Sequence, residues 1–188
     1  MNEEKLVKLV ALSNFMRWFC LALMIIVIVA GAGVVLLGAL TGASWFIDWF
    51  ATNDQLGGAA FSPDTVGTAT RILIVVINGV TLFFTCRGLW FLMKLFSAFA
   101  KRDILSLRTS QFLRAAGSSF LVVAIYGVVA QTASILLLTM GNPAGQKQLS
   151  IGFGSEQLFA ILLAGTLFAI GHVLSIATSI DEENKGFV

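Results

Sequence analysis

The sequence predicts an all-α fold, a four-helix transmembrane bundle with both chain termini on the cytoplasmic side. The composition, four long apolar segments and the placement of Lys and Arg lead to this prediction. The chain of 188 residues is 57% hydrophobic and 12% charged, with a mean hydropathy of +0.91, whereas a soluble domain has about 25% charged residues. So few charges cannot cover a water-soluble protein of this size. The length suits one domain, so we expect residues 1–188 to form a single transmembrane domain.

The four apolar segments predict membrane spans at about residues 17–41, 68–92, 115–140 and 157–180. About 20 residues of α-helix cross a hydrocarbon core roughly 30 Å thick. Backbone in lipid must satisfy its own hydrogen bonds, and runs this long without two-residue alternation are typical of helices. The second span is the shortest uncharged run, because Arg71 and Arg87 lie inside it. Their long side chains can extend toward the opposite headgroup layers.

The basic residues predict the orientation of these spans. Ten of the twelve lie on one side, in the N-terminal segment, around the connection between spans two and three, and at the C-terminus: Lys5, Lys8, Arg17, Arg87, Lys94, Lys101, Arg102, Arg108, Arg114 and Lys185. Arg71 and Lys147 lie on the other side. Loops rich in Lys and Arg stay in the cytoplasm, so both termini and the middle connection are expected there.

The connection between spans two and three is predicted to be an amphipathic helical hairpin. Apolar residues of 91–99 continue the helical pattern beyond the second span, and Ser106 is a suitable N-cap for the next helix. The hairpin carries the basic residues Lys94, Lys101, Arg102, Arg108 and Arg114. Two uses are open. The hairpin contacts anionic headgroups of the lipid bilayer, or it docks a cytoplasmic protein together with the acidic tail that contains Glu182 and Glu183.

Two stretches of this sequence resemble a bacterial membrane family, the domain of unknown function 2975. One is 89–117, with the sequence LWFLMKLFSAFAKRDILSLRTSQFLRAAG, and the other is the acidic tail 180–188, IDEENKGFV. Arg102 stands where this family usually has glycine, and Leu105 where phenylalanine is usual. The resemblance implies four spans and a bacterial inner-membrane location, but no known activity. It also points to a partner, because members of the family resemble gene neighbours of small helix-turn-helix regulators.

Polar residues inside the spans are few. Asn78, Gln131 and His172 each fall within roughly 6 Å of the midplane of their predicted span, and we expect them to face the bundle interior because polar groups in lipid are costly. They either form hydrogen bonds between helices or make a site for a proton, an ion or a small ligand. A single histidine with no nearby carboxylate or cysteine is a poor metal site, so no metal and no cofactor are predicted.

These features favour a regulatory or sensing membrane protein that is a partner of a cytoplasmic regulator. The alternative is a small transporter or channel subunit that uses the polar intramembrane residues. The sequence has no HExxH, GxSxG, phosphate-loop or CxxC motif, so we do not expect an enzyme. A net charge of +2 does not favour direct nucleic-acid binding. The small residues of the first span allow close helix packing, within the bundle or in a homo-oligomer: Ala30, Gly31, Ala32 and Gly33, and the pair Gly38 and Gly42 at small-xxx-small spacing.

Overall fold

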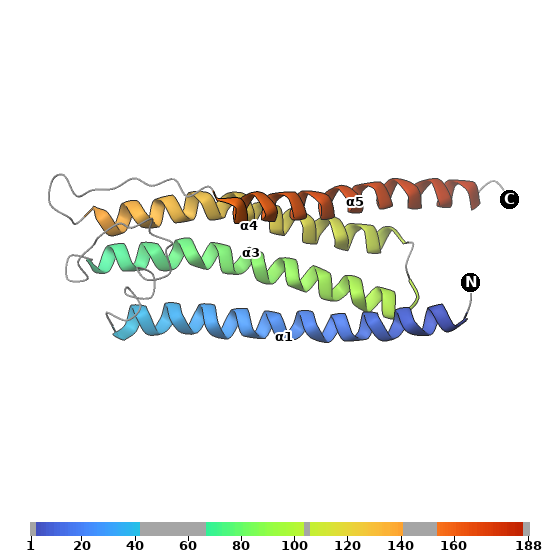
Figure 1. Ribbon diagram of the computed structural model, residues 1–188, viewed down its shortest axis with the longest axis horizontal. Coiled ribbons are helices and arrows are strands. Elements are labelled where there is room, and N and C mark those ends of the chain that lie inside the picture. Colours follow the sequence, from blue (N-terminus) through green and yellow to red (C-terminus); the bar gives the residue numbers. More distant parts are fainter. Residues whose placement is uncertain (1–2, 42–66, 104–105, 141–153, 186–188) are drawn as a thin grey trace.

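The computed structural model describes residues 3–41, 67–103, 106–140 and 154–185 of the chain, and this part is helical without a strand. Four helices follow one another: α1 (Glu3–Thr41), α3 (Thr68–Ala100), α4 (Leu107–Thr139) and α5 (Ser155–Lys185). Figure 1 shows that α1 begins, α5 ends and α3 connects to α4 at the same end of the molecule. We call this the turn end. The predicted all-α class is confirmed.

All four helices are long and apolar enough to cross a membrane, as expected of a multi-pass membrane protein. Their surfaces agree with this, because large apolar side chains point outward along each helix. Phe159, Leu162 and Leu163 of α5 are 66 to 70% exposed. Such a surface would be unstable in water at about 25 cal/mol per Å² of exposed apolar area. A lipid environment removes this cost.

The helices pack in chain order. Helix α1 packs against α3, α3 against α4, and α4 against α5. Figure 1 accordingly shows α1 and α5 at opposite edges of the array, with α3 and α4 between them. Helix α4 has a neighbour on each side, and it buries more residues than the other helices do in the described part.

Two glycines bring α4 and α5 into backbone contact. A Cβ atom added to Gly117 of α4 would lie 2.5 Å from the backbone nitrogen of Phe168, and one added to Gly171 of α5 would lie 2.7 Å from that of Arg114. Any side chain at these positions would push the backbones apart. This small-residue packing is how apolar helices approach closely where there is no hydrophobic driving force between them.

These two glycine contacts also set the register of the two helices. Phe168 is close to the centre of the predicted span 157–180, whereas its neighbour Gly117 is close to the start of the predicted span 115–140. Helix α5 is therefore displaced along α4 toward the turn end. The displacement follows from the positions of Gly117 and Gly171, because the close approach is possible only where the glycines face the opposite backbone.

Hydroxyl groups in the packed helices are satisfied mainly by their own helix. Ser119 and Thr178 are buried, and each donates to the carbonyl four residues earlier, at 2.7 Å. A hydrogen bond between helices joins α4 to α3, where the Tyr126 hydroxyl donates to the carbonyl of Ile77 at 3.2 Å. Close packing at small residues therefore holds the helices together, and the Tyr126 hydrogen bond adds a polar contact between α3 and α4.

Candidate functional site

The polar intramembrane residues predicted as a site do not come together. Asn78 is half-buried, and its side-chain nitrogen donates to the carbonyl of Ile74 on its own helix at 2.9 Å. Gln131 is half-buried and has an interaction partner. His172 is exposed on α5 and does not face the interior as expected. Helix α5 packs on α4, whereas Asn78 belongs to α3.

The displacement of α5 explains where His172 lies. His172 follows Gly171, which lies beside Arg114, and Arg114 is 17 residues before Gln131 on α4. Seventeen residues of helix correspond to roughly 26 Å along the axis. Asn78, in contrast, is near the level of Tyr126, five residues from Gln131. A depth estimated from the centre of each span assumes that all spans are level with one another, and α4 and α5 are not.

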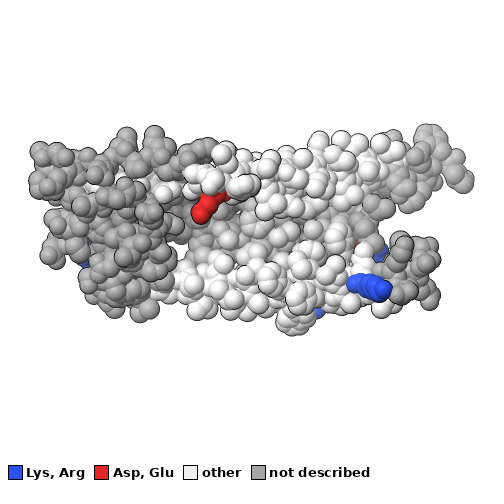
Figure 2. Space-filling view, in the orientation of Figure 1, with Lys and Arg blue, Asp and Glu red and all other residues white. Residues whose placement is uncertain are grey.

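The turn end instead gathers the predicted basic residues. Lys94, Lys101, Arg102, Arg108 and Arg114 are all exposed and lie at or near the connection between α3 and α4. Glu182 and Glu183 belong to the last turns of α5 at this same end, but their side chains lie outside the described part of the chain. Figure 2 shows that the visible face of the described helices is largely uncharged, and that a blue patch lies close to the turn end.

Hydrogen bonds fix the backbone at the end of α3, on one side of residues 104–105. Arg102 has a φ of 63°, and the backbone nitrogens of Arg102 and Asp103 donate to the carbonyls of Phe99 and Ala98 at 3.0 and 3.1 Å. This pair of bonds is the Schellman motif, whose left-handed residue is usually glycine. The structure thus gives Arg102 a backbone conformation that glycine favours.

Ser106 begins the next helix, as predicted. Its hydroxyl oxygen accepts from the backbone nitrogen of Thr109 at 3.3 Å, which is the N-cap arrangement. The same hydroxyl lies 3.1 Å from a carboxylate oxygen of Asp103, to which it donates, and the Thr109 hydroxyl donates to the Asp103 carbonyl at 3.1 Å. The basic side chains therefore extend from a fixed backbone.

Aromatic rings support several of the cations at this end. The Lys94 amino group lies 5.3 Å from the ring centre of Trp90 and 5.8 Å from that of Phe112. The guanidinium carbon of Arg17 lies 5.6 Å from the Trp18 ring. Cation–π contacts of this kind hold a cation in place without neutralising its charge. Within the described part of the chain, no carboxylate pairs with Arg17 or Lys94.

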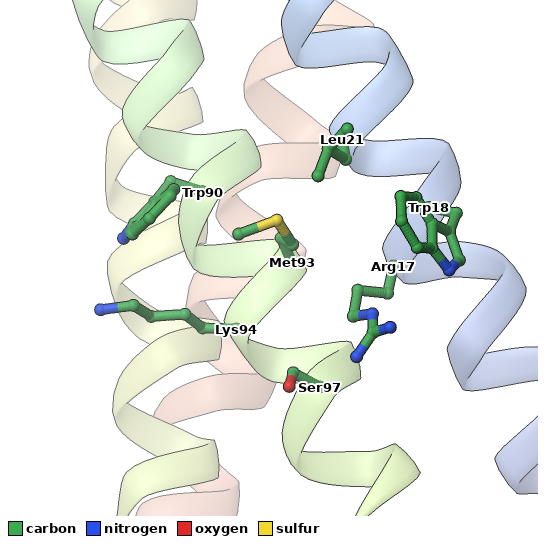
Figure 3. Close-up of a pocket in the computed structure, with 7 residues that line it drawn as sticks. All are labelled: Arg17, Trp18, Leu21, Trp90, Met93, Lys94 and Ser97. Atoms are coloured by element: carbon green, nitrogen blue, oxygen red, sulfur yellow. The ribbon is translucent and has the colours of Figure 1, made fainter.

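Among the described residues, three hollows open toward the turn end, and the lining of each includes at least one basic side chain. The first, of about 350 Å³, lies between α1 and α3 and is lined by Arg17, Trp18, Leu21, Trp90, Met93, Lys94 and Ser97 (Figure 3). The second, of about 240 Å³, is lined by Lys94, Ser97, Ala98, Lys101, Asp103, Arg108 and Phe112. The third, of about 350 Å³, is lined by Gln111, Arg114, Ala115, Ser118 and Phe168. The first two share Lys94 and Ser97, so they adjoin.

The sequence-based site omitted Arg17, Trp18 and Trp90. The sequence does indicate these residues, because each tryptophan has a basic residue nearby on its own helix. This residue is at i−1 for Trp18 and at i+4 for Trp90. Tryptophans concentrate at the membrane interface. The sequence alone does not show that α1 packs against α3. This packing brings the Arg17–Trp18 pair and the Trp90–Lys94 pair to one groove.

The fold and the turn end define a multi-pass helical protein with a basic, aromatic-supported end. Comparisons with protein-family models, with curated proteins and with solved structures found no match for this chain. Within the described residues no group of three or more His, Cys, Asp or Glu side chains is placed to hold a metal ion.

Proposed function

We propose that this protein resides in a bacterial inner membrane and recruits a cytoplasmic regulator to the connection between α3 and α4. The positions of Lys and Arg support the cytoplasmic orientation of this end. The length of the helices supports the accessibility of this end to a cytoplasmic protein. Helices α3 and α4 have 33 residues each, which corresponds to about 50 Å, so roughly 20 Å of each helix exceeds the hydrocarbon core.

The observation that carries the proposal is the set of exposed cations around the hydrogen-bonded end of α3 and start of α4. Lys101, Arg102 and Arg108 are exposed, and within the described part of the chain none of them forms an ion pair with a carboxylate. The nearby Asp103 carboxylate accepts a hydrogen bond from Ser106. A rigid basic surface favours an acidic partner, because charge complementarity speeds association and excludes basic competitors.

The partner that we propose is a small helix-turn-helix regulator with an acidic docking face. The resemblance of residues 89–117 to the domain of unknown function 2975 supports this choice of partner. The protein would then hold the regulator at the membrane and away from its DNA. It needs no nucleic-acid contact of its own for this role.

Photo-cross-linking in intact cells tests the proposal. A photoreactive amino acid at Leu107, which is exposed beside the basic residues, should cross-link to an acidic cytoplasmic protein. The variant Lys101→Gln with Arg108→Gln should lower the yield at least fivefold, because it removes two cations. The charge-conserving variant Lys101→Arg with Arg108→Lys should retain it.

The matched control places the same amino acid at Gln146, in the connection on the opposite side of the predicted topology. If the cross-linked protein appears from Gln146 as well, or if the yield from Leu107 does not depend on charge, the docking proposal fails. A cross-linked protein without a helix-turn-helix domain would overturn the proposed partner. The transport alternative gains no support, because Asn78 and His172 lie on helices that do not neighbour each other in the packing order.

A further inference from the structure

The groove between α1 and α3 at the turn end has the chemistry of a lipid site. Leu21 of α1 and Met93 of α3 line this groove, and Figure 3 shows Arg17 extending from α1 into the space between the helices toward Ser97. Along both helices the apolar pair lies toward the membrane centre and the polar pair toward the turn end. The groove is therefore apolar at one end and cationic at the other, as an amphiphile requires.

The polar end of the groove offers unused hydrogen-bond donors. Arg17 is half-buried, yet its contact is with the Trp18 ring and not with a carboxylate of the described chain. The Ser97 hydroxyl is also without a hydrogen-bond partner in the described residues, whereas Ser118 and Ser119 donate to the carbonyl of Ala115. A guanidinium group and a hydroxyl together match the oxygens of a phosphate group, which an arginine binds in a bidentate manner.

The two tryptophans place this polar end at the headgroup level. Trp18 of α1 and Trp90 of α3 line the same groove and are 61% and 44% exposed. Tryptophans on the outside of membrane helices lie at the boundary between headgroups and acyl chains. Lys94 lies beside Trp90 and adds a second positive charge at that level.

We infer that the groove between α1 and α3 binds one anionic phospholipid. Its phosphodiester contacts Arg17 and Ser97 within the field of Lys94, and its acyl chain lies along Leu21 and Met93. The groove, of about 350 Å³, accommodates the headgroup and the adjoining part of a chain. This site is independent of the proposed regulator, which would contact Lys101 and Arg108 on the turn.

Native mass spectrometry of the full-length protein, released from nanodiscs of mixed lipid, tests the inference. Phosphatidylglycerol should be retained roughly tenfold more than phosphatidylcholine with the same acyl chains. One basic residue near a membrane surface changes anionic-lipid affinity about fivefold, so Arg17→Gln should reduce retention about fivefold. Arg17→Gln with Lys94→Gln should bring it to the phosphatidylcholine level.

Two matched variants distinguish a specific lipid site from a general effect of charge. Arg71→Gln removes one charge at the opposite end of α3 and should leave retention unchanged. Leu21→Trp fills the apolar part of the groove without changing charge and should lower retention as strongly as Arg17→Gln. Equal retention of the two lipids, or an equal loss in Arg71→Gln, would overturn the inference. Release of the lipid by millimolar inorganic phosphate would assign the groove to a soluble anion instead.

Tryptophan fluorescence locates the lipid. In a variant with Trp45→Phe and Trp49→Phe, the remaining Trp18 and Trp90 should be quenched by phosphatidylglycerol brominated near the headgroup end of its chain. Brominated phosphatidylcholine at the same mole fraction should quench them less. Equal quenching by both lipids would contradict a specific site, whatever the outcome of the cross-linking test for the regulator.

Discussion

Arg102 combines an unfavourable backbone angle with an exposed positive charge. Its φ of 63° lies in the left-handed region, which costs a residue with a side chain about 1 kcal/mol relative to glycine. The chain accepts this cost at a position that also bears an exposed positive charge. The turn geometry alone favours glycine, so the arginine adds a positive charge here at a cost in backbone energy.

The variant Arg102→Gly should therefore stabilise the protein. The loss of left-handed strain is partly offset by the greater freedom of glycine in the unfolded chain, so we expect a net gain of about 0.5 kcal/mol. For a chain of this length that corresponds to roughly 1 to 2 °C in Tm, measured by thermal denaturation in detergent micelles. Arg102→Ala removes the charge and keeps the strain. If alanine stabilises as much as glycine, the backbone explanation is wrong.

The contact between helices α4 and α5 depends on two glycines. Gly117 and Gly171 let the two backbones touch at the Phe168 and Arg114 nitrogens. Neither backbone can move away without losing the packing along the whole interface. This interface also sets the axial position of α5, and through it the position of His172.

Gly117→Ala is expected to separate α4 from α5 and to destabilise the protein by about 1 to 3 kcal/mol, the usual cost of overpacking. Gly127 of α4 is the matched control, since a Cβ atom there meets nothing within 4 Å. Gly127→Ala should be neutral or stabilising, because alanine has a higher helix propensity than glycine. Thermal denaturation of both variants in the same detergent makes the comparison. An equal loss in the two variants would show that the contact is not the cause.

The elements and the site differ in how far the sequence predicts them. Four apolar helices follow from composition and length, because lipid leaves a backbone few alternatives. The Ser106 cap follows from local chemistry. The depth of His172 cannot be predicted in this way, because it depends on which glycines of α4 and α5 meet the backbone of the opposite helix. Gly31 and Gly33 were expected to allow close packing within the bundle or in a homo-oligomer. Among the described residues, a Cβ atom on Gly33 would meet nothing within 4 Å and one on Gly31 would meet only the flexible end of Leu82, so these two glycines do not bring α1 into backbone contact within the described bundle.

At the scale of the whole molecule, the ends of the helices support one testable topology. The start of α1, the end of α5 and the turn between α3 and α4 share one end, and most of the basic residues lie toward it. In a variant with Cys20 and Cys86 replaced by alanine, Leu107→Cys should react with a membrane-impermeant maleimide only after the membrane is opened. Gln146→Cys should react in intact spheroplasts. The reverse pattern would mean the opposite orientation and would contradict the proposed docking of a cytoplasmic regulator.

The order in which the helices pack has a consequence for biogenesis. Every extensive helix contact in the described chain joins neighbours in sequence, α1 with α3, α3 with α4 and α4 with α5. Contacts between elements that are close in sequence cost less loop-closure entropy than contacts between distant ones, and they form sooner. Each helix after α1 thus meets a packing partner that was synthesised before it: α3 meets α1, α4 meets α3, and α5 meets α4. The chain can assemble from its first helix to its last during synthesis.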